Sequence, residues 1–132
     1  MAWVMDALSE ARELQVSAAR VGFDWPDVSG AVSKLREEVD ELGDAIARGV
    51  ATEIVAELGD VLFSAVNVSR FVAVDPSDAL QSSSRKFATR FSSVGEELEK
   101  RGRRFEECSL AELDSVWELL KSQETRGGQS AH

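Results

Sequence analysis

Apolar side chains recur at every third or fourth position along most of the chain, the repeat of a helix with one buried face. Turn residues interrupt this repeat at Gly22, Pro26 and Gly49, and again at Asp75-Pro76. A barrel or sandwich would need many more turn residues. The pattern predicts an all-α helical bundle of about five helices: four at about 2–20, 31–48, 52–74 and 75–102, and a short fifth that opens at Ser109.

The second predicted helix carries an apolar stripe and an acidic row. The stripe, which we expect to be buried, consists of Leu35, Val39, Leu42 and Ile46. The acidic row lies about a quarter turn away at helical spacing and holds Lys34, Glu38 and Glu41, with Glu37 beside it. A solvated charged face would more often lie opposite the core. This row therefore lies where a neighbouring helix can meet it.

The third predicted helix is apolar nearly all round, which is typical of a central, buried element. Its polar exceptions follow one another at three, four and three residues, and so share one side: Glu57, Asp60, Ser64 and Asn67. A buried polar group without a partner costs several kcal/mol. This polar ridge is the clearest physical indication of a functional site.

The remaining segments are expected to supply the core and a tail. The aromatic residues of the turn before Pro26, Phe23 and Trp25, are expected to plug the end of the core, with a direct role in binding as the alternative. The fourth helix is expected to direct inward Leu80, Phe87, Phe91, Val94 and Leu98. From Thr125 the chain is polar and contains glycine, so we expect a disordered tail at 125–132 after a single domain at 1–124.

Charge and composition exclude several classes of function. The net charge of -9 argues against binding nucleic acid through its phosphates. The single cysteine, Cys108, cannot form an internal disulfide, which together with the absence of a secretory signal favours the cytoplasm. The apolar stretch 54–74 contains Glu57, Asp60 and Arg70, which are costly in lipid, so no membrane span is expected.

Carboxylates on two packed helices would form a cation site. If Glu38, Glu41, Glu57 and Asp60 converge, like charges about 4 Å apart repel by roughly 4 kcal/mol per pair near a protein surface. Such a group takes up protons or binds a multivalent cation. The only histidine is the last residue, so an all-oxygen site for Mg²⁺, with Mn²⁺ as a substitute, is indicated. Either acidic pair alone would more often be a solvated face.

Mg²⁺ is commonly completed by substrate phosphates, so this interpretation leads to phosphate chemistry. A water activated by the cation would be the nucleophile. Glu37 is a spare carboxylate that could take its proton. The candidates for neutralising the outer phosphates are Lys34, Lys86 and Arg90.

Three runs in this order resemble the MazG family of all-α nucleoside triphosphate pyrophosphohydrolases: KLREEVDEL (34–42), ELGDVLFSAVNVSRF (57–71) and KFATRF (86–91). The upstream VGFDWPDVSG and the closing VWELLKSQE are also similar to the catalytic C-terminal domain of bacterial MazG. The resemblance covers about residues 7–124. Bacterial MazG has two such domains, whereas this chain supplies one, and the connector at 49–53 is short.

The resemblance implies Mg²⁺-dependent hydrolysis of a nucleoside triphosphate to the monophosphate and pyrophosphate, in nucleotide-pool housekeeping. It implies Glu38, Glu41, Glu57 and Asp60 as metal ligands, with Glu37 and Glu38 as catalytic residues. Positions that match substrate-binding residues are Lys34, Asn67, Lys86, Arg90 and Trp117, the last near the base. It also implies a homodimer.

Two alternatives to this function remain open. A relative with the same carboxylate scaffold could be selective for dUTP or for a phosphoribosyl nucleotide. A protein of a different class would be a non-catalytic nucleotide-binding or interaction module, in which the acidic residues only tune an interface between copies. Release of pyrophosphate distinguishes the enzymes from the module, and base selectivity distinguishes the enzymes from each other.

Overall fold

A computed structural model describes residues 5–130, with side chains for 5–124. Within that range the chain is all-helical and has no strand, so the predicted fold class is confirmed. The elements are α1 (Ala7–Arg20), α2 (Val28–Arg48), α3 (Ala51–Phe71), α4 (Pro76–Lys100), the short 3₁₀-helix η1 (Phe105–Glu107) and α5 (Leu110–Ser130).

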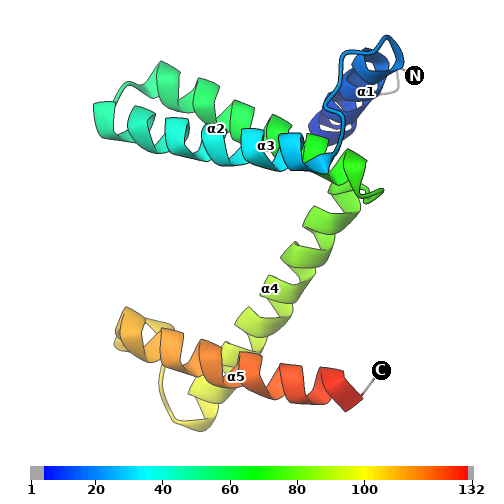
Figure 1. Ribbon diagram of the computed structural model, residues 1–132. Coiled ribbons are helices and arrows are strands. Elements are labelled where there is room, and N and C mark those ends of the chain that lie inside the picture. Colours follow the sequence, from blue (N-terminus) through cyan, green and yellow to red (C-terminus); the bar gives the residue numbers. More distant parts are fainter. Residues whose placement is uncertain (1–4, 131–132) are drawn as a thin grey trace, which may run out of the picture. The chain divides into compact units, whose positions relative to one another are not determined.

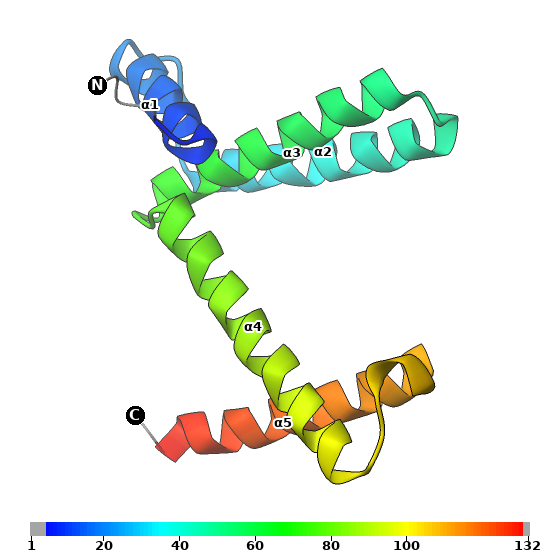
Figure 2. The same ribbon diagram turned by 180° about the vertical axis from the view of Figure 1, so that it is seen from behind.

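The chain divides into two compact units, Met1–Leu80 and Gln81–His132. In the first unit, α2 and α3 form an antiparallel hairpin and lie side by side in both views (Figure 1; Figure 2). Helix α1 packs against α3, near the end of the hairpin away from its connector. The hairpin places the two acidic stretches of the sequence on neighbouring helices.

Local capping explains where the hairpin helices begin and end. Asp27 accepts a hydrogen bond from the Ser29 backbone N–H (2.9 Å) at the start of α2, which satisfies one of the free donors there. Gly49 ends α2 with a φ of 74°, a left-handed conformation that glycine adopts without strain. Helix α3 follows after only one further residue, Val50.

The expected burial of the apolar stripe on α2 is wrong in part. Leu35 and Leu42 are half-buried, whereas Val39 and Ile46 are exposed. The buried positions of α2 are instead the small residues Ala31 and Ala45 and the acid Glu38. Small side chains let α2 and α3 approach closely, so the face that contacts α3 includes the acidic row.

Helix α3 is likewise not the buried central element that its composition predicts. Only Ser64 and Val66 are buried, while Val55 is 72% exposed and Leu58 and Leu62 are also exposed. The physical reason is that α1 and α2 can cover only part of the surface of α3. Its remaining apolar face is uncovered within this unit.

The second unit has its own small core between α4 and α5. Val94 and Leu98 of α4 pack with Val116 of α5, and five half-buried side chains surround them: Phe105, Cys108, Leu113, Trp117 and Leu120. The inward direction expected for the fourth helix is therefore confirmed at Val94 and Leu98. Phe87 and Phe91 also face this core, since their rings lie 5.3 Å from Trp117 and 5.1 Å from Phe105 between centroids, but both stay partly open to solvent. Leu80 is exposed, so the expectation is wrong there.

The chain ends differ from the sequence-based expectation. The first helix begins at Ala7 with Asp6 as its cap, and residues 2–4 of its predicted range lie outside the described residues. Helix α5 runs to Ser130, so the backbone of 125–130 continues this helix, and the disorder expected from Thr125 stays a prediction. Extending an existing helix gains one hydrogen bond per residue without a new nucleus. Residues 131–132 of the expected tail lie outside the described range.

The described helices also bear on the membrane prediction. None of them combines the length with the low charge needed to cross a bilayer. This includes α3, the stretch that most resembles a span by composition.

Gly30 provides a test of how the turn before α2 packs. An added Cβ would lie 2.8 Å from Cε3 of Trp25, whereas a Cβ at Gly43 on the same helix would meet nothing within 4 Å. We expect Gly43→Ala to raise the free energy of unfolding by about 0.5–1 kcal/mol, because alanine favours the helix. Gly30→Ala should lower it and move the Trp25 ring. Chemical denaturation checks both, and equal effects of the two changes would contradict this packing.

Candidate metal centre

Three carboxylates converge across the α2–α3 hairpin. Glu38 and Glu41 come from α2 and Glu57 from α3, and one oxygen from each lies within 4.8 Å of the other two. Residues three apart on a helix share a face, so Glu38 and Glu41 both meet the partner helix. The antiparallel pairing then brings Glu57 to the same level.

Two oxygens of this group are buried without a partner. Glu38 is only 5% exposed, and neither its Oε2 nor Oε2 of Glu57 accepts a hydrogen bond. A buried, unpaired carboxylate oxygen is costly because it has lost its hydration. The cost is recovered if a cation binds both oxygens, so these atoms fit a metal ligand set.

Lys34 partly neutralises the group from one side. Its Nζ lies 3.0 Å from Oε1 of Glu38 and 3.5 Å from Oε1 of Glu37. The hydrogen bond to Glu38, together with the charges of Glu37 and Glu38, raises the pKa of Lys34. Glu37 itself is exposed, so its carboxylate is open to solvent beside the buried Glu38.

The crowding of acids alters the titration of Glu41. A hydrogen bond shared with Glu38 and the negative charge of Glu38 raise the pKa of Glu41, with smaller contributions from burial and from Glu57. The raised pKa means that the metal-free group holds a proton more readily than an ordinary glutamate does. Protons and cations therefore compete for the same oxygens.

The donor set selects the kind of cation. All three ligating groups are carboxylates, with neither histidine nor cysteine among them. Hard oxygen ligands suit Mg²⁺, Ca²⁺ and Mn²⁺, whereas zinc and iron sites usually include nitrogen or sulfur. The residues fit a hard divalent cation.

Asp60 lies outside the group that the structure brings together. It is exposed on α3, and the cluster found in the described part of the chain consists of Glu38, Glu41 and Glu57. Three of the four carboxylates that the sequence predicts to converge are thus adjacent in one chain. The fourth sits one turn along α3 from Glu57.

The other predicted site residues divide between the two units. Asn67 is half-buried near the end of α3 in the first unit. In the second unit, Arg90 pairs with Glu124 (Nε to Oε2, 2.8 Å) and lies over the ring of Trp117, 5.3 Å from its centroid. Lys86, one turn before Arg90 on α4, is exposed.

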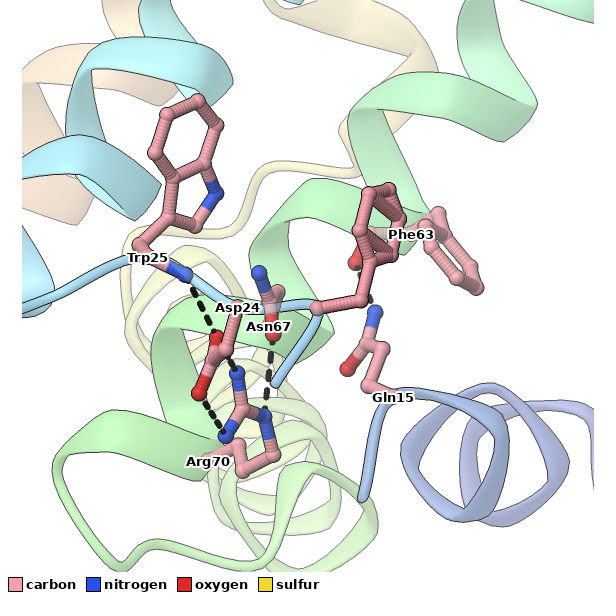
Figure 3. Close-up of a pocket in the computed structure, with 7 residues that line it drawn as sticks. Gln15, Asp24, Trp25, Phe63, Asn67 and Arg70 are labelled. Carbon is pink, nitrogen blue, oxygen red and sulfur yellow. Dashed lines mark hydrogen bonds and ion pairs between the residues drawn. The ribbon is translucent and has the colours of Figure 1, made fainter. Parts of the chain in front are cut away.

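The first unit also contains a cavity of about 310 Å³ that the sequence did not predict. Figure 3 shows its polar walls, where Arg70 of α3 pairs with Asp24 of the turn. Arg70 binds both oxygens of Asp24 and also donates from Nε to Oδ1 of Asn67 (3.0 Å). The residues that line the cavity are Gln15, Phe23, Asp24, Trp25, Phe63, Asn67 and Arg70.

This cavity corrects the expected role of the turn aromatics. Phe23 is 79% exposed and Trp25 is also exposed, so they border an open cavity and do not plug a core. The pairing that shapes the turn joins residues 46 positions apart, and helical periodicity carries no information on such a contact. The VGFDWP run, with an acid between two aromatics, was the available signal.

The described residues thus define an all-helical protein with a cluster of three carboxylates between two antiparallel helices, and this cluster suits a hard cation. A family model for the MazG nucleotide pyrophosphohydrolase domain matches residues 27–95. The match includes the three carboxylates and both hairpin helices. The chain belongs to the MazG family.

Relatives extend this similarity to most of the chain. It is 45% identical over 118 residues, 89% of its length, to the nucleoside triphosphate pyrophosphohydrolase/pyrophosphatase MazG of Thermotoga maritima. It is 34% identical over 122 residues, 91% of its length, to the nucleoside triphosphate pyrophosphohydrolase of Escherichia coli K12. The matched regions are 45% and 46% of these two proteins, so the chain spans about half the length of each.

The raised pKa of Glu41 predicts how metal-free stability depends on pH. A raised folded-state pKa contributes stability that is present below the ordinary glutamate pKa and is lost as the pH rises through the folded value. Glu41→Gln removes the repulsion, so in EDTA it should raise the thermal midpoint by a few degrees at neutral pH. The difference should shrink toward about pH 4.

Thermal unfolding from pH 4 to 8 measures this effect, with Asp40→Asn, an exposed site on the same helix, as the matched control. With Mg²⁺ in excess, the unmodified protein should have a higher thermal midpoint than Glu41→Gln, because it gains the free energy of Mg²⁺ binding. An equal shift from both substitutions in EDTA would show that repulsion within the group is not the cause.

Proposed function

We propose that this chain hydrolyses nucleoside triphosphates to nucleoside monophosphates and pyrophosphate, dependent on Mg²⁺, with Mn²⁺ as a substitute. The observation that carries the proposal is the pair of buried oxygens without partners, on Glu38 and Glu57, beside Glu41. Two relatives bear the name nucleoside triphosphate pyrophosphohydrolase, which supports the substrate class. In a cell the reaction would serve nucleotide-pool housekeeping.

The carboxylates would hold the cation, with Glu38, Glu41 and Glu57 as ligands and Asp60 as a fourth. When bound, the cation supplies charge neutralisation for the phosphates and makes a water more acidic. Within one chain, Asp60 lies outside the group of three close carboxylates, and it is exposed to solvent. Its position suits a ligand that engages once the substrate is present.

Glu37 and Lys34 would act on the water and on the phosphates. Glu37 is exposed, and its Oε1 lies 3.5 Å from Nζ of Lys34. Its carboxylate would accept a proton from the attacking water. Lys34 binds Glu38 in the metal-free chain. A cation on Glu38 would weaken that contact and leave the Lys34 ammonium available for a phosphate oxygen.

Lys86 and Arg90 are the remaining cationic groups that the family resemblance implies for substrate binding. Lys86 and Arg90 share one face of α4 at a spacing of four residues, and Arg90 already binds a carboxylate, Glu124. A guanidinium that pairs with a carboxylate can exchange it for a phosphate of similar geometry. Trp117, beside Arg90, would offer a ring to the substrate, and Asn67 an amide.

The chain would assemble as a homodimer through the exposed apolar residues of the hairpin. Apolar residues of the hairpin are exposed, among them Val39 and Ile46 of α2 and Val55 and Leu62 of α3. Uncovered apolar surface on this scale is typical of an interface. A second copy is the occupant that the family resemblance implies, and its helices would cover the face of α3 that α1 and α2 leave open.

Glu38→Gln should lower kcat for nucleoside triphosphates by roughly 100-fold or more, because the cation loses a charged ligand and the transition-state charge is less neutralised. The measurement is pyrophosphate and monophosphate release with Mg²⁺ and each of the common nucleoside triphosphates. Asp44→Asn, an exposed acid of α2 outside the group, is the matched control and should keep full activity.

The same assay tests the alternatives. Full activity in both Glu38→Gln and Asp60→Asn would make the ligand assignment wrong. A folded, unmodified protein that releases no pyrophosphate would be an interaction module. Hydrolysis of the nucleoside triphosphate of one base only would indicate a base-selective enzyme of the same superfamily.

Val55→Lys should convert a dimer to monomers, because it places a charge in the uncovered apolar face of α3. Thr52→Lys, at an exposed polar position one turn earlier, adds the same charge and should leave the assembly unchanged. Light scattering coupled to size-exclusion chromatography gives the mass of each variant. A monomeric unmodified protein over the micromolar range would overturn the dimer.

A further inference from the structure

Arg90 lies between a carboxylate and an aromatic ring of the second unit. Its Nε donates to Oε2 of Glu124 at 2.8 Å, and its guanidinium carbon lies 5.3 Å from the centroid of the Trp117 ring. The side chain of Arg90 is 14% exposed and that of Glu124 is 40% exposed. The chain thus supplies its own negative partner to a guanidinium that the family resemblance implies in substrate binding.

The spacing of residues on α5 allows Glu124 to reach this guanidinium. Trp117 and Glu124 are seven residues apart, so after two helical turns they return to the same face. Both contact Arg90 of α4. The ring and the carboxylate therefore act on one cationic group.

The Glu124 contact is not part of the small core of this unit. The side chains that α5 contributes to the core end at Leu120, and residues 121–124 are all exposed. Glu124 can therefore leave Arg90 by rotating its own side chain, without any loss of packing between α4 and α5.

Arg90 is held more firmly than its partner. Its guanidinium lies over the Trp117 ring, an arrangement that is favourable for a cation. The Phe87 ring of α4 lies 5.3 Å from the same indole between centroids, so Trp117 is fixed from the side of α4 as well. When an anion approaches, the guanidinium can stay in place while the carboxylate moves away.

A phosphate and a carboxylate use a guanidinium in the same way, because both accept charge-assisted hydrogen bonds from its N–H groups. Nε carries a single hydrogen, so a phosphate oxygen that accepts it takes the place of Oε2 of Glu124. Two anions left side by side would also repel each other. The apparent affinity for phosphate then falls with the fraction of chains in which Arg90 is available.

We propose that Glu124 competes with the phosphates of the substrate for Arg90 and thereby raises KM. The inference rests on the proposed function, since it takes Arg90 as a group that binds a substrate phosphate. The competition weakens every ligand that uses Arg90 by the same factor. It therefore acts on the product pyrophosphate as well as on the substrate.

A positioning role for Glu124 makes the opposite prediction. If the carboxylate served to orient Arg90, its loss would free the guanidinium and weaken the binding of phosphates. Competition instead predicts tighter binding once the carboxylate is lost. The sign of the change distinguishes the two roles.

Glu124→Gln removes the charge and keeps the size of the side chain. We expect KM for nucleoside triphosphates with Mg²⁺ to fall about three- to fivefold and kcat to stay within about twofold, because partly exposed ion pairs contribute on this scale. An unchanged or higher KM overturns the inference.

Glu118→Gln, at an exposed position of the same helix, is the matched control. It removes the same charge, and at physiological ionic strength it should leave KM within about 1.5-fold, because exposed charges are screened. An equal fall in KM from both substitutions would show a general effect of net charge and overturn the competition.

Binding without turnover is measured with pyrophosphate and Mg²⁺. Isothermal titration of the full chain gives Kd, and ¹⁵N spectra follow the Arg90 Nε–H and Trp117 indole signals. We expect both signals to move, and Glu124→Gln to lower Kd by the same three- to fivefold factor. In an Arg90→Ala background, Glu124→Gln should leave Kd unchanged, because the pair no longer exists. Absence of pyrophosphate binding, or the same gain without Arg90, overturns the inference.

The two measurements distinguish failure of this inference from failure of the proposed function. Tighter pyrophosphate binding by Glu124→Gln in a protein that hydrolyses nothing would keep the competition and remove the enzyme. Hydrolysis of nucleoside triphosphates with KM and Kd unchanged in Glu124→Gln would keep the enzyme and remove the competition.

Discussion

Repulsion among the carboxylates of the α2–α3 hairpin is the interaction on which the site depends. Glu38, Glu41 and Glu57 bring oxygens within 4.8 Å of one another, and two of the buried oxygens have no partner. Helix packing must hold these groups together against their charge. The small residues Ala31 and Ala45, buried on α2, allow the close approach that supplies this packing. A multivalent cation bound by these oxygens would relieve the repulsion that the packing opposes.

The uncovered apolar surface and the three clustered carboxylates lie on the same two helices. Helix α3 is buried at Ser64 and Val66 and exposed at Val55 and Leu62. If a second copy covers the exposed face, assembly and the geometry of the carboxylates become coupled, because both depend on the position of α3. Glu57 would then be held by contacts from two directions.

Helical periodicity was sufficient to predict the helices of the hairpin and the acidic row on α2. It was insufficient for burial, since Val39 and Ile46 have the spacing of core residues and are exposed. An apolar stripe looks the same whether its own chain or another molecule covers it. The Asp24–Arg70 pair and its cavity could not be predicted either, because they depend on how a turn folds onto a helix 46 residues away.

The two-residue connector between α2 and α3 limits how the two helices can rotate relative to each other. Only Gly49 and Val50 separate the two helices. A connector this short cannot accommodate an extra residue without moving one of the helices. One inserted residue would turn α3 by about 100° relative to α2 if the helix kept its other contacts. Glu57 would then face away from Glu38. In this chain a one-residue insertion at Gly49 would therefore separate the carboxylates, whereas an insertion near Gly102, which lies outside the hairpin, would leave them together.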